Sequence, residues 1–135
     1  MSELLYIPYA VLLLAVILIY APRAVVGREM AKLDGGYNND DPRLQQAVLQ
    51  GVGKRALNAH HNAIEALPIF GLGVLAALQR GGNLRVIAAL SIGFAVARVL
   101  YLVFYLRNNA QFRSACWALG LVASLALYVV AVLGR

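Results

Sequence analysis

The residues best suited to chemistry form a polar stripe in front of a long apolar segment. Residues 67–78 are entirely apolar, whereas residues 54–65 contain amides, histidines, two basic residues and one carboxylate. On a helix with about 100° per residue, Asn58, Asn62 and Glu65 share one face. Unpaired polar groups at the edge of hydrocarbon are costly, so this stripe indicates a functional site more than a simple membrane crossing.

A second group of polar residues lies inside another apolar segment. Arg98 is followed by Tyr101 and Tyr105, three and seven residues later, on the same helical face. An arginine near the centre of a membrane helix costs about 2.5–3.5 kcal/mol on insertion scales, so it needs a partner or a wet cavity. We expect Glu65 to be that partner, because it is the only acidic residue within an apolar span. A structural ion pair, and an interfacial aromatic belt for the tyrosines, are the alternatives to a binding site.

The elements that position these residues are membrane helices. The chain has 135 residues, of which 61% are hydrophobic and 13% charged, far from the proportions of soluble proteins. Its apolar residues fall in four blocks of nearly the 20 or so residues that cross a bilayer. These blocks predict one domain over 1–135, an all-α integral membrane four-helix bundle. The expected spans are 4–21, 56–79, 84–106 and 112–133.

The basic residues are distributed unevenly between the two ends of this bundle. The net charge is +6, and eight basic residues fall in the first and third connections against three on the other side. The positive-inside rule therefore places these two connections in the cytoplasm and both termini on the opposite side. No basic stripe alternates with exposed aromatic residues, so nucleic-acid binding is not expected. The eight are Arg23, Arg28, Lys32, Arg43, Lys54, Arg55, Arg107 and Arg113, and the three are Arg80, Arg85 and Arg135.

Local signals predict the start of the second long helix. Residues 34–42 are dense in turn formers, and Asp41 before Pro42 is typical of an N-cap with proline in the first helical position. We expect this helix to run into the second span, loosened around Gly51 and Gly53. Two further expectations concern single residue types. Cys116 should be a small apolar residue of the fourth span, and Tyr6, Tyr9, Tyr20 and Tyr128 should be interfacial belt residues.

These two groups of polar residues resemble the signatures of the MAPEG family, the membrane-associated proteins in eicosanoid and glutathione metabolism, and are similar to its bacterial-type members that resemble microsomal glutathione transferase. In the second span the resemblance rests on Arg55, Ala59-His60, Asn62, Glu65 and Pro68-x-Phe70. In the third span it rests on Arg98-x-x-Tyr101-x-x-x-Tyr105-x-Arg107, and it ends at Arg113. With four spans and a similar length, it covers nearly the whole chain.

The resemblance implies a homotrimer in the membrane, with sites between neighbouring subunits that take glutathione from the cytoplasm and an apolar small molecule from the lipid. Arg113 would lie beside the glutathione thiol as the catalytic group, where a guanidinium lowers the pKa of the thiol and favours the reactive thiolate. No metal site is implied. The residues implied for the glutathione site are Arg55, Asn58, Asn62, Glu65, Arg98, Tyr101 and Tyr105.

The chain also departs from the family pattern. Asn58 occupies a position where enzymes of the family commonly carry a second arginine, and Ala66 replaces an aromatic or polar ligand contact. Lys54 or His61 could supply the missing charge. The predicted function is a glutathione-dependent membrane enzyme acting on a lipophilic electrophile or lipid hydroperoxide. The alternative is a non-catalytic lipid-binding or scaffold protein of the same fold. A small multidrug exporter fits less well, because the first span has no carboxylate beyond Glu3.

Overall fold

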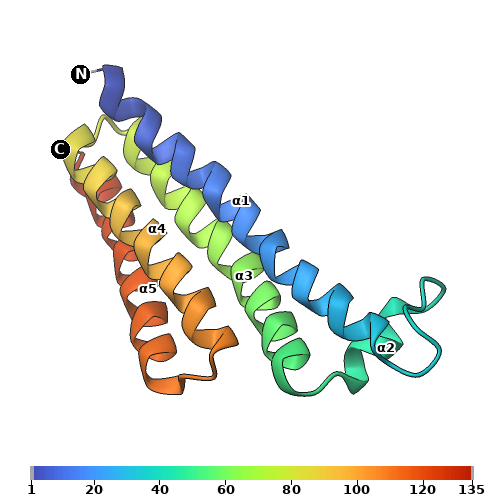
Figure 1. The fold of residues 1–135 in the computed structure, drawn as a ribbon. Coiled ribbons are helices and arrows are strands. Elements are labelled where there is room, and N and C mark those ends of the chain that lie inside the picture. The colour runs from blue at the N-terminus through green and yellow to red at the C-terminus, as the bar shows by residue number, and fades with distance from the viewer. Residues whose placement is uncertain (1, 135) are drawn as a thin grey trace.

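The computed structural model describes residues 2–134, which form helices joined by short loops and contain no strand (Figure 1). Four of the helices are long and apolar enough to cross a membrane, which confirms the predicted all-helical fold with four candidate spans. The short helix α2 belongs to the connection between the first two spans. The bounds are α1 Ser2–Ala31, α2 Pro42–Val48, α3 Gly51–Gln79, α4 Leu84–Leu106 and α5 Ala110–Leu133.

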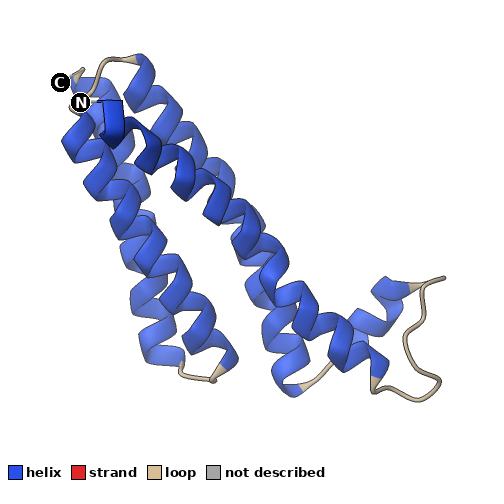
Figure 2. Cartoon of the chain, turned by 45° about the horizontal axis from the view of Figure 1, so that its top comes forward, coloured by secondary structure: helices blue, strands red, loops and turns tan. Residues whose placement is uncertain are grey.

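The long helices are arranged as two pairs, α1 with α3 and α4 with α5. The pairs lie close together at the end that holds both termini and diverge toward the α1–α3 connection (Figures 1 and 2). The rings of Phe70 on α3 and Phe94 on α4 stack face to face where the pairs are joined, with centroids 3.8 Å apart. The remaining buried residues of this core are Val11, Ala15, Val74, Ala77, Ile87, Ala123, Leu127 and Ala131.

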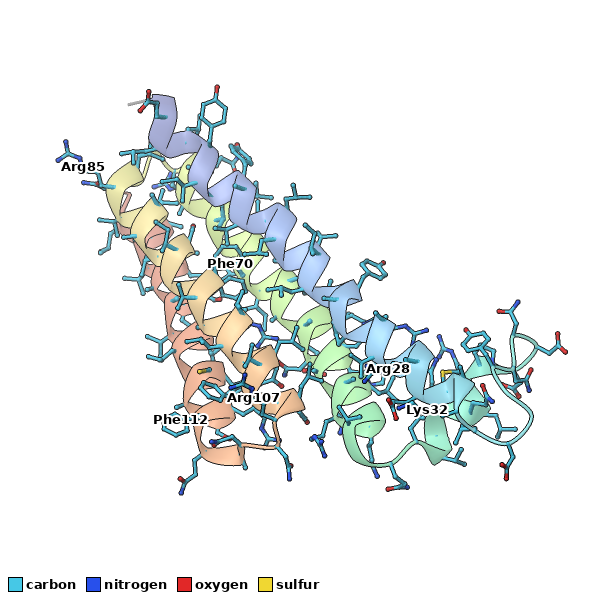
Figure 3. All side chains as sticks on the ribbon, viewed as in Figure 1. Arg28, Lys32, Phe70, Arg85, Arg107 and Phe112 are labelled. Carbon is cyan, nitrogen blue, oxygen red and sulfur yellow. The ribbon has the colours of Figure 1, made fainter. Side chains whose placement is uncertain are left out.

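Basic side chains lie at both ends of the bundle but more of them at the diverging end. Arg28, Lys32 and Arg107 lie at that end, and Arg85 lies at the other (Figure 3). The two ion pairs among residues 2–134 join Glu29 to Arg28 and Lys32. Most of the basic groups at this end therefore have no ion-pair partner among the described residues.

Helix α1 ends at Ala31, ten residues beyond the expected end of the first span at residue 21. It continues through Pro22, although proline removes one backbone hydrogen bond and crowds the preceding turn. The carbonyl of Ile19, in that turn, receives a hydrogen bond of 2.7 Å from Nδ1 of His60 on α3. Beyond the proline, Val26 and Met30 are fully buried in a second small core. Tertiary packing thus stabilises the part of the helix that continues beyond the proline.

The start of α2 follows the sequence prediction, whereas its junction with α3 does not. The Asp41 side chain caps α2 by accepting a hydrogen bond of 3.3 Å from the Leu44 amide, with Pro42 as the first helical residue. Helix α2 then ends, and α3 begins at Gly51 with φ of +56°. A left-handed residue interrupts a helix, so the loosening expected at Gly51 is a complete break, and the expected continuous helix is wrong. Gly53 lies inside regular helix.

Helices α3 and α5 approach each other closely at Gly73. A Cβ atom at this position would lie 3.2 Å from the Cβ of Leu127 and 3.2 Å from the carbonyl oxygen of Ser124. Small residues allow membrane helices to pack through van der Waals contact in this way. One turn away, the Tyr128 hydroxyl donates a hydrogen bond of 2.9 Å to the Ile69 carbonyl. Tyr128 therefore links two helices, which the expected belt role does not include.

Cys116 has the predicted structural role. It is buried, and it packs with Ala59 of α3 and Tyr101 of α4 in a third small core. This core joins the two helix pairs on the diverging side of the Phe70–Phe94 stack, next to the polar residues of α3 and α4.

Candidate functional site

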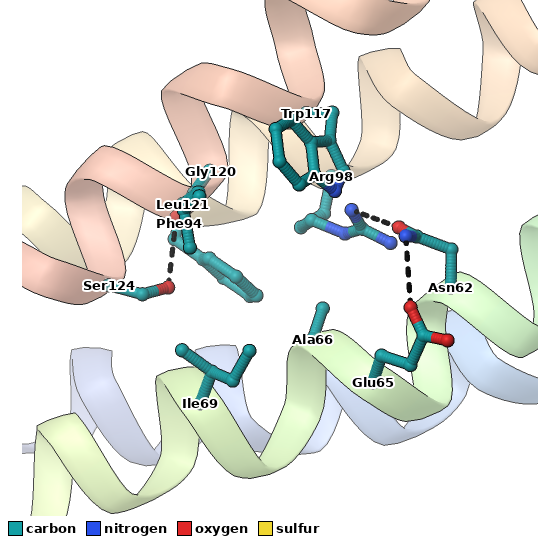
Figure 4. Close-up of a pocket in the computed structure, with 10 residues that line it drawn as sticks. All are labelled: Asn62, Glu65, Ala66, Ile69, Phe94, Arg98, Trp117, Gly120, Leu121 and Ser124. Carbon is teal, nitrogen blue, oxygen red and sulfur yellow. Dashed lines mark hydrogen bonds between the residues drawn. The ribbon is translucent and has the colours of Figure 1, made fainter.

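Polar side chains of α3 and α4 form a network inside the apolar part of the bundle. Nη1 of Arg98 donates a hydrogen bond of 2.9 Å to Oδ1 of Asn62, and Nδ2 of Asn62 donates to Glu65 at 3.5 Å (Figure 4). Arg98 is 6% exposed, whereas Glu65 is exposed. The expected direct pair between Arg98 and Glu65 is therefore wrong within the described chain. Asn62 is the intervening group, since it lies one turn earlier on α3 and reaches the guanidinium first.

Aromatic rings extend this network toward α5. The guanidinium carbon of Arg98 lies 4.3 Å from the ring centroid of Tyr101, and that of Arg113 lies 4.5 Å from the ring centroid of Tyr105. The two rings meet edge to face with centroids 5.3 Å apart. Contacts of this kind stabilise a cation at low dielectric. Three helices therefore bring Arg113 to the residues that the sequence places on α3 and α4.

Two adjoining pockets open beside these side chains. The first has a volume of about 90 Å³ and a mainly apolar lining. It is lined by Asn62, Glu65, Ala66, Ile69, Phe94, Arg98, Trp117, Gly120, Leu121 and Ser124. The second has a volume of about 220 Å³ and is lined by Asn62, Tyr101, Tyr105, Arg113, Ser114 and Trp117. Asn62 and Trp117 belong to both, so a polar compartment and an apolar compartment share a wall.

Two of the residues expected in the site lie outside these pockets. Nε of Arg55 donates a hydrogen bond of 3.3 Å to the carbonyl of Leu106, the last residue of α4. A cation at this position satisfies a terminal carbonyl and stabilises the helix dipole. Asn58 is exposed and lines neither pocket. The structure therefore brings together six of the eight expected residues: Asn62, Glu65, Arg98, Tyr101, Tyr105 and Arg113.

The main residue that sequence reasoning missed is Trp117, the only tryptophan in the chain. It lies one turn after Arg113 on α5, so the two side chains share a face, and this spacing was the available signal. The apolar pocket has space beside the Trp117 ring because two small residues line its opposite walls. These are Ala66 on α3 and Gly120 on α5, where a Cβ atom would lie 3.4 Å from Cδ of Arg98.

The sequence matches a known protein family. The model of the MAPEG family matches residues 6–133, which is nearly the whole chain. No curated protein matches the sequence.

Proposed function

This chain belongs to the MAPEG family, and from that premise we propose that it is a glutathione-dependent membrane enzyme acting on a lipophilic electrophile or lipid hydroperoxide. The family includes glutathione transferases and peroxidases as well as non-catalytic members. The observation that carries the proposal is the adjoining pair of pockets, one lined by Arg113 and tyrosines and the other mainly apolar. A polar thiol and an apolar partner could meet at their shared wall.

The charges around the pockets suit glutathione. Arg98 and Arg113 contribute two positive charges, and Glu65 contributes one negative charge. Glutathione carries two carboxylates and one ammonium group, so the ligand and the site have complementary charges of each sign. Guanidinium groups bind carboxylates with charge-assisted hydrogen bonds, and Glu65 is the acidic group available to the ammonium.

Arg113 is the residue proposed to activate the thiol. Its guanidinium borders the polar pocket, where it would lower the pKa of a bound thiol and favour the thiolate. The thiolate would attack the electrophilic carbon of a molecule held in the apolar pocket, and the leaving group would depart with the bonding electron pair. With a hydroperoxide, the thiolate would instead attack the terminal peroxide oxygen and break the O–O bond, so that the alkoxide takes up a proton and leaves as the alcohol. A second glutathione would then convert the resulting sulfenic acid to glutathione disulfide and water. Holding both reactants at one wall supplies the proximity that such a reaction needs.

We further propose a homotrimer similar to microsomal glutathione transferase, with the α1–α3 and α4–α5 connections in the cytoplasm. The concentration of basic residues at the diverging end supports this orientation. In a Cys116→Ala background, an impermeant maleimide added to intact cells should label a single cysteine placed at Gln79 but not one placed at Asn39. Labelling of the Asn39→Cys variant from outside would show that the protein has the opposite orientation. A dimer or monomer in a mass measurement of the purified protein would exclude the trimer.

The non-catalytic alternative also rests on a specific observation. Arg55 is engaged by the Leu106 carbonyl, and Asn58 replaces an expected arginine and is exposed. Two groups that could hold glutathione carboxylates are therefore not directed to the pockets of the single chain. A protein of this fold that binds lipid but not glutathione would have this arrangement.

Calorimetric titration of the detergent-purified protein with glutathione at millimolar concentration separates the two functions. We expect saturable binding, weakened by Glu65→Gln, together with ultraviolet absorbance of the bound thiolate near neutral pH. A tripeptide in which serine replaces cysteine should bind without this absorbance. Fluorescence of Trp117, which borders both pockets, provides an independent readout of occupancy. Absence of binding by both readouts would exclude the glutathione enzyme and favour the lipid-binding alternative.

A further inference from the structure

A large recess lies on the other side of α3, away from the candidate glutathione site. Its volume is about 920 Å³, within the upper range of ligand pockets. It opens between α1, α2 and α3 at the diverging end of the bundle. Its lining residues are Ile19, Tyr20, Arg23, Pro42, Arg43, Gln46, Ala47, Leu57, His60, His61 and Ile64.

The polar part of this recess is basic. Arg23 of α1 and Arg43 of α2 both line it together with two histidines, and none of its lining residues is acidic. Neither arginine takes part in an ion pair among residues 2–134. The bond from Nδ1 of His60 to the Ile19 carbonyl holds that ring in place, and the positive charge of the recess comes from the two arginines. The recess therefore has uncompensated positive charge and suits an anion.

The depth of the recess corresponds to the membrane surface. About 20 helical residues cross the hydrocarbon, so α1 reaches the far surface near Arg23 when it enters near Leu4. Ile19 and Tyr20 line the recess just below that level, and Ile64 lines it from α3. Tyr20 and Ile64 are also 65% and 47% exposed, so the apolar wall continues onto the surface that faces lipid.

Helix α2 has the features of a helix that lies in the membrane interface. It buries none of its own residues, and Leu44 and Val48, one turn apart, are 65% and 58% exposed. Arg43 and Ala47 lie on the neighbouring face and line the recess. Gln45 fixes the helix to the preceding loop through bonds to the Gly36 carbonyl at 2.7 Å and the Asn38 amide at 2.9 Å. An anchored helix with apolar side chains directed outward is typical of interfacial binding.

We infer that this recess binds an anionic phospholipid, with the phosphate between Arg23 and Arg43 and an acyl chain along Ile19, Tyr20 and Ile64. Basic recesses between membrane helices bind anionic headgroups through such contacts. A soluble phosphate would use the arginines but not the apolar wall, and the wall together with α2 favours a lipid. The inference is independent of glutathione chemistry, because the recess shares no residue with either pocket of the candidate site.

Native mass spectrometry of the purified full chain tests the inference with phosphatidylglycerol and phosphatidylcholine of identical acyl chains. Wild type should bind phosphatidylglycerol more tightly, and the double variant Arg23→Gln/Arg43→Gln should lose about thirtyfold in that affinity, as expected for two headgroup contacts. The matched control is Arg28→Gln/Lys32→Gln, which removes two charges at the same end of the bundle but outside the recess. This control should keep the preference.

Further experiments distinguish the molecules that could bind in the recess. Excess glycerol phosphate should not displace the lipid, and displacement would assign the recess to a soluble phosphate. The double variant Leu44→Ser/Val48→Ser should weaken the binding of both lipids while preserving the preference for phosphatidylglycerol. This variant keeps the test valid if the arginine variant misfolds. Equal affinity for the two lipids, or an equal loss in the control, would overturn the inference. Loss of oligomer mass in Arg23→Gln/Arg43→Gln without any lipid preference would assign the recess to a second copy of the chain.

Discussion

Nη1 of Arg98 lies 2.9 Å from Oδ1 of Asn62, a hydrogen bond that joins α4 to α3 inside the apolar part of the bundle. The amide is neutral, so it satisfies one donor of the guanidinium without neutralising its charge. The positive charge of Arg98 therefore remains available to an anionic ligand in the adjoining pocket. This arrangement explains why an arginine in a membrane helix can be both a structural link and a binding group.

Replacing Asn62 with alanine should destabilise the protein by about 3 kcal/mol, because a buried guanidinium would lose its acceptor. Reversible unfolding in mixed micelles, followed by circular dichroism, would measure the change. Asn58→Ala is the matched control, since Asn58 is exposed and should stay within about 0.5 kcal/mol of wild type. Equal effects at the two positions would show that the bond to Arg98 contributes nothing to stability.

Arg55→Gln should lower stability by about 1 kcal/mol and leave glutathione affinity nearly unchanged, because Arg55 caps the last carbonyl of α4. The neighbouring exposed residue provides the control, Lys54→Gln, with little expected effect. Unfolding and glutathione titration should be measured on both variants. Weakened glutathione binding without a loss of stability would return Arg55 to the binding site that the family resemblance implies.

Arg113→Leu should remove the charge that stabilises the glutathione thiolate while leaving carboxylate contacts intact. Glutathione should still bind, but thiolate absorbance should fall, and turnover with a reactive aryl halide should decrease by about tenfold to a thousandfold. Arg107→Leu removes an equal charge from an exposed position that lines neither pocket, and it should keep both signals. If thiolate absorbance and turnover were unchanged in Arg113→Leu, the role of Arg113 would be only to orient the chain in the membrane.

Gly73→Ala should destabilise the bundle by about 1–3 kcal/mol, since the added methyl group would press against the backbone of Ser124 and the side chain of Leu127. The same substitution at Gly93 provides the control, because a Cβ atom there meets nothing within 4 Å. Gly93→Ala should be neutral or stabilising by up to about 1 kcal/mol through helix propensity. If Gly73→Ala were more stable than Gly93→Ala in detergent unfolding, the close α3–α5 contact would be contradicted.

Much of the architecture follows from local sequence. Long apolar blocks can cross hydrocarbon only as helices, because every backbone polar group must be satisfied within the segment. The Asp41–Pro42 cap was likewise predictable, since capping depends on residues close in the chain. Helical periodicity also placed Asn62 and Glu65 on one face, and Arg98 with Tyr101 on another.

Tertiary structure decided which of these residues meet. Periodicity gives the face of a helix but neither its axial position nor its rotation against a neighbour, and each residue of shift moves a side chain by 1.5 Å and about 100°. For this reason the sequence did not show that Arg98 would reach Asn62 before Glu65, or that Arg55 would cap α4. The extension of α1 through Pro22 has the same origin, because its stability comes from packing against α3, which no local pattern of α1 contains.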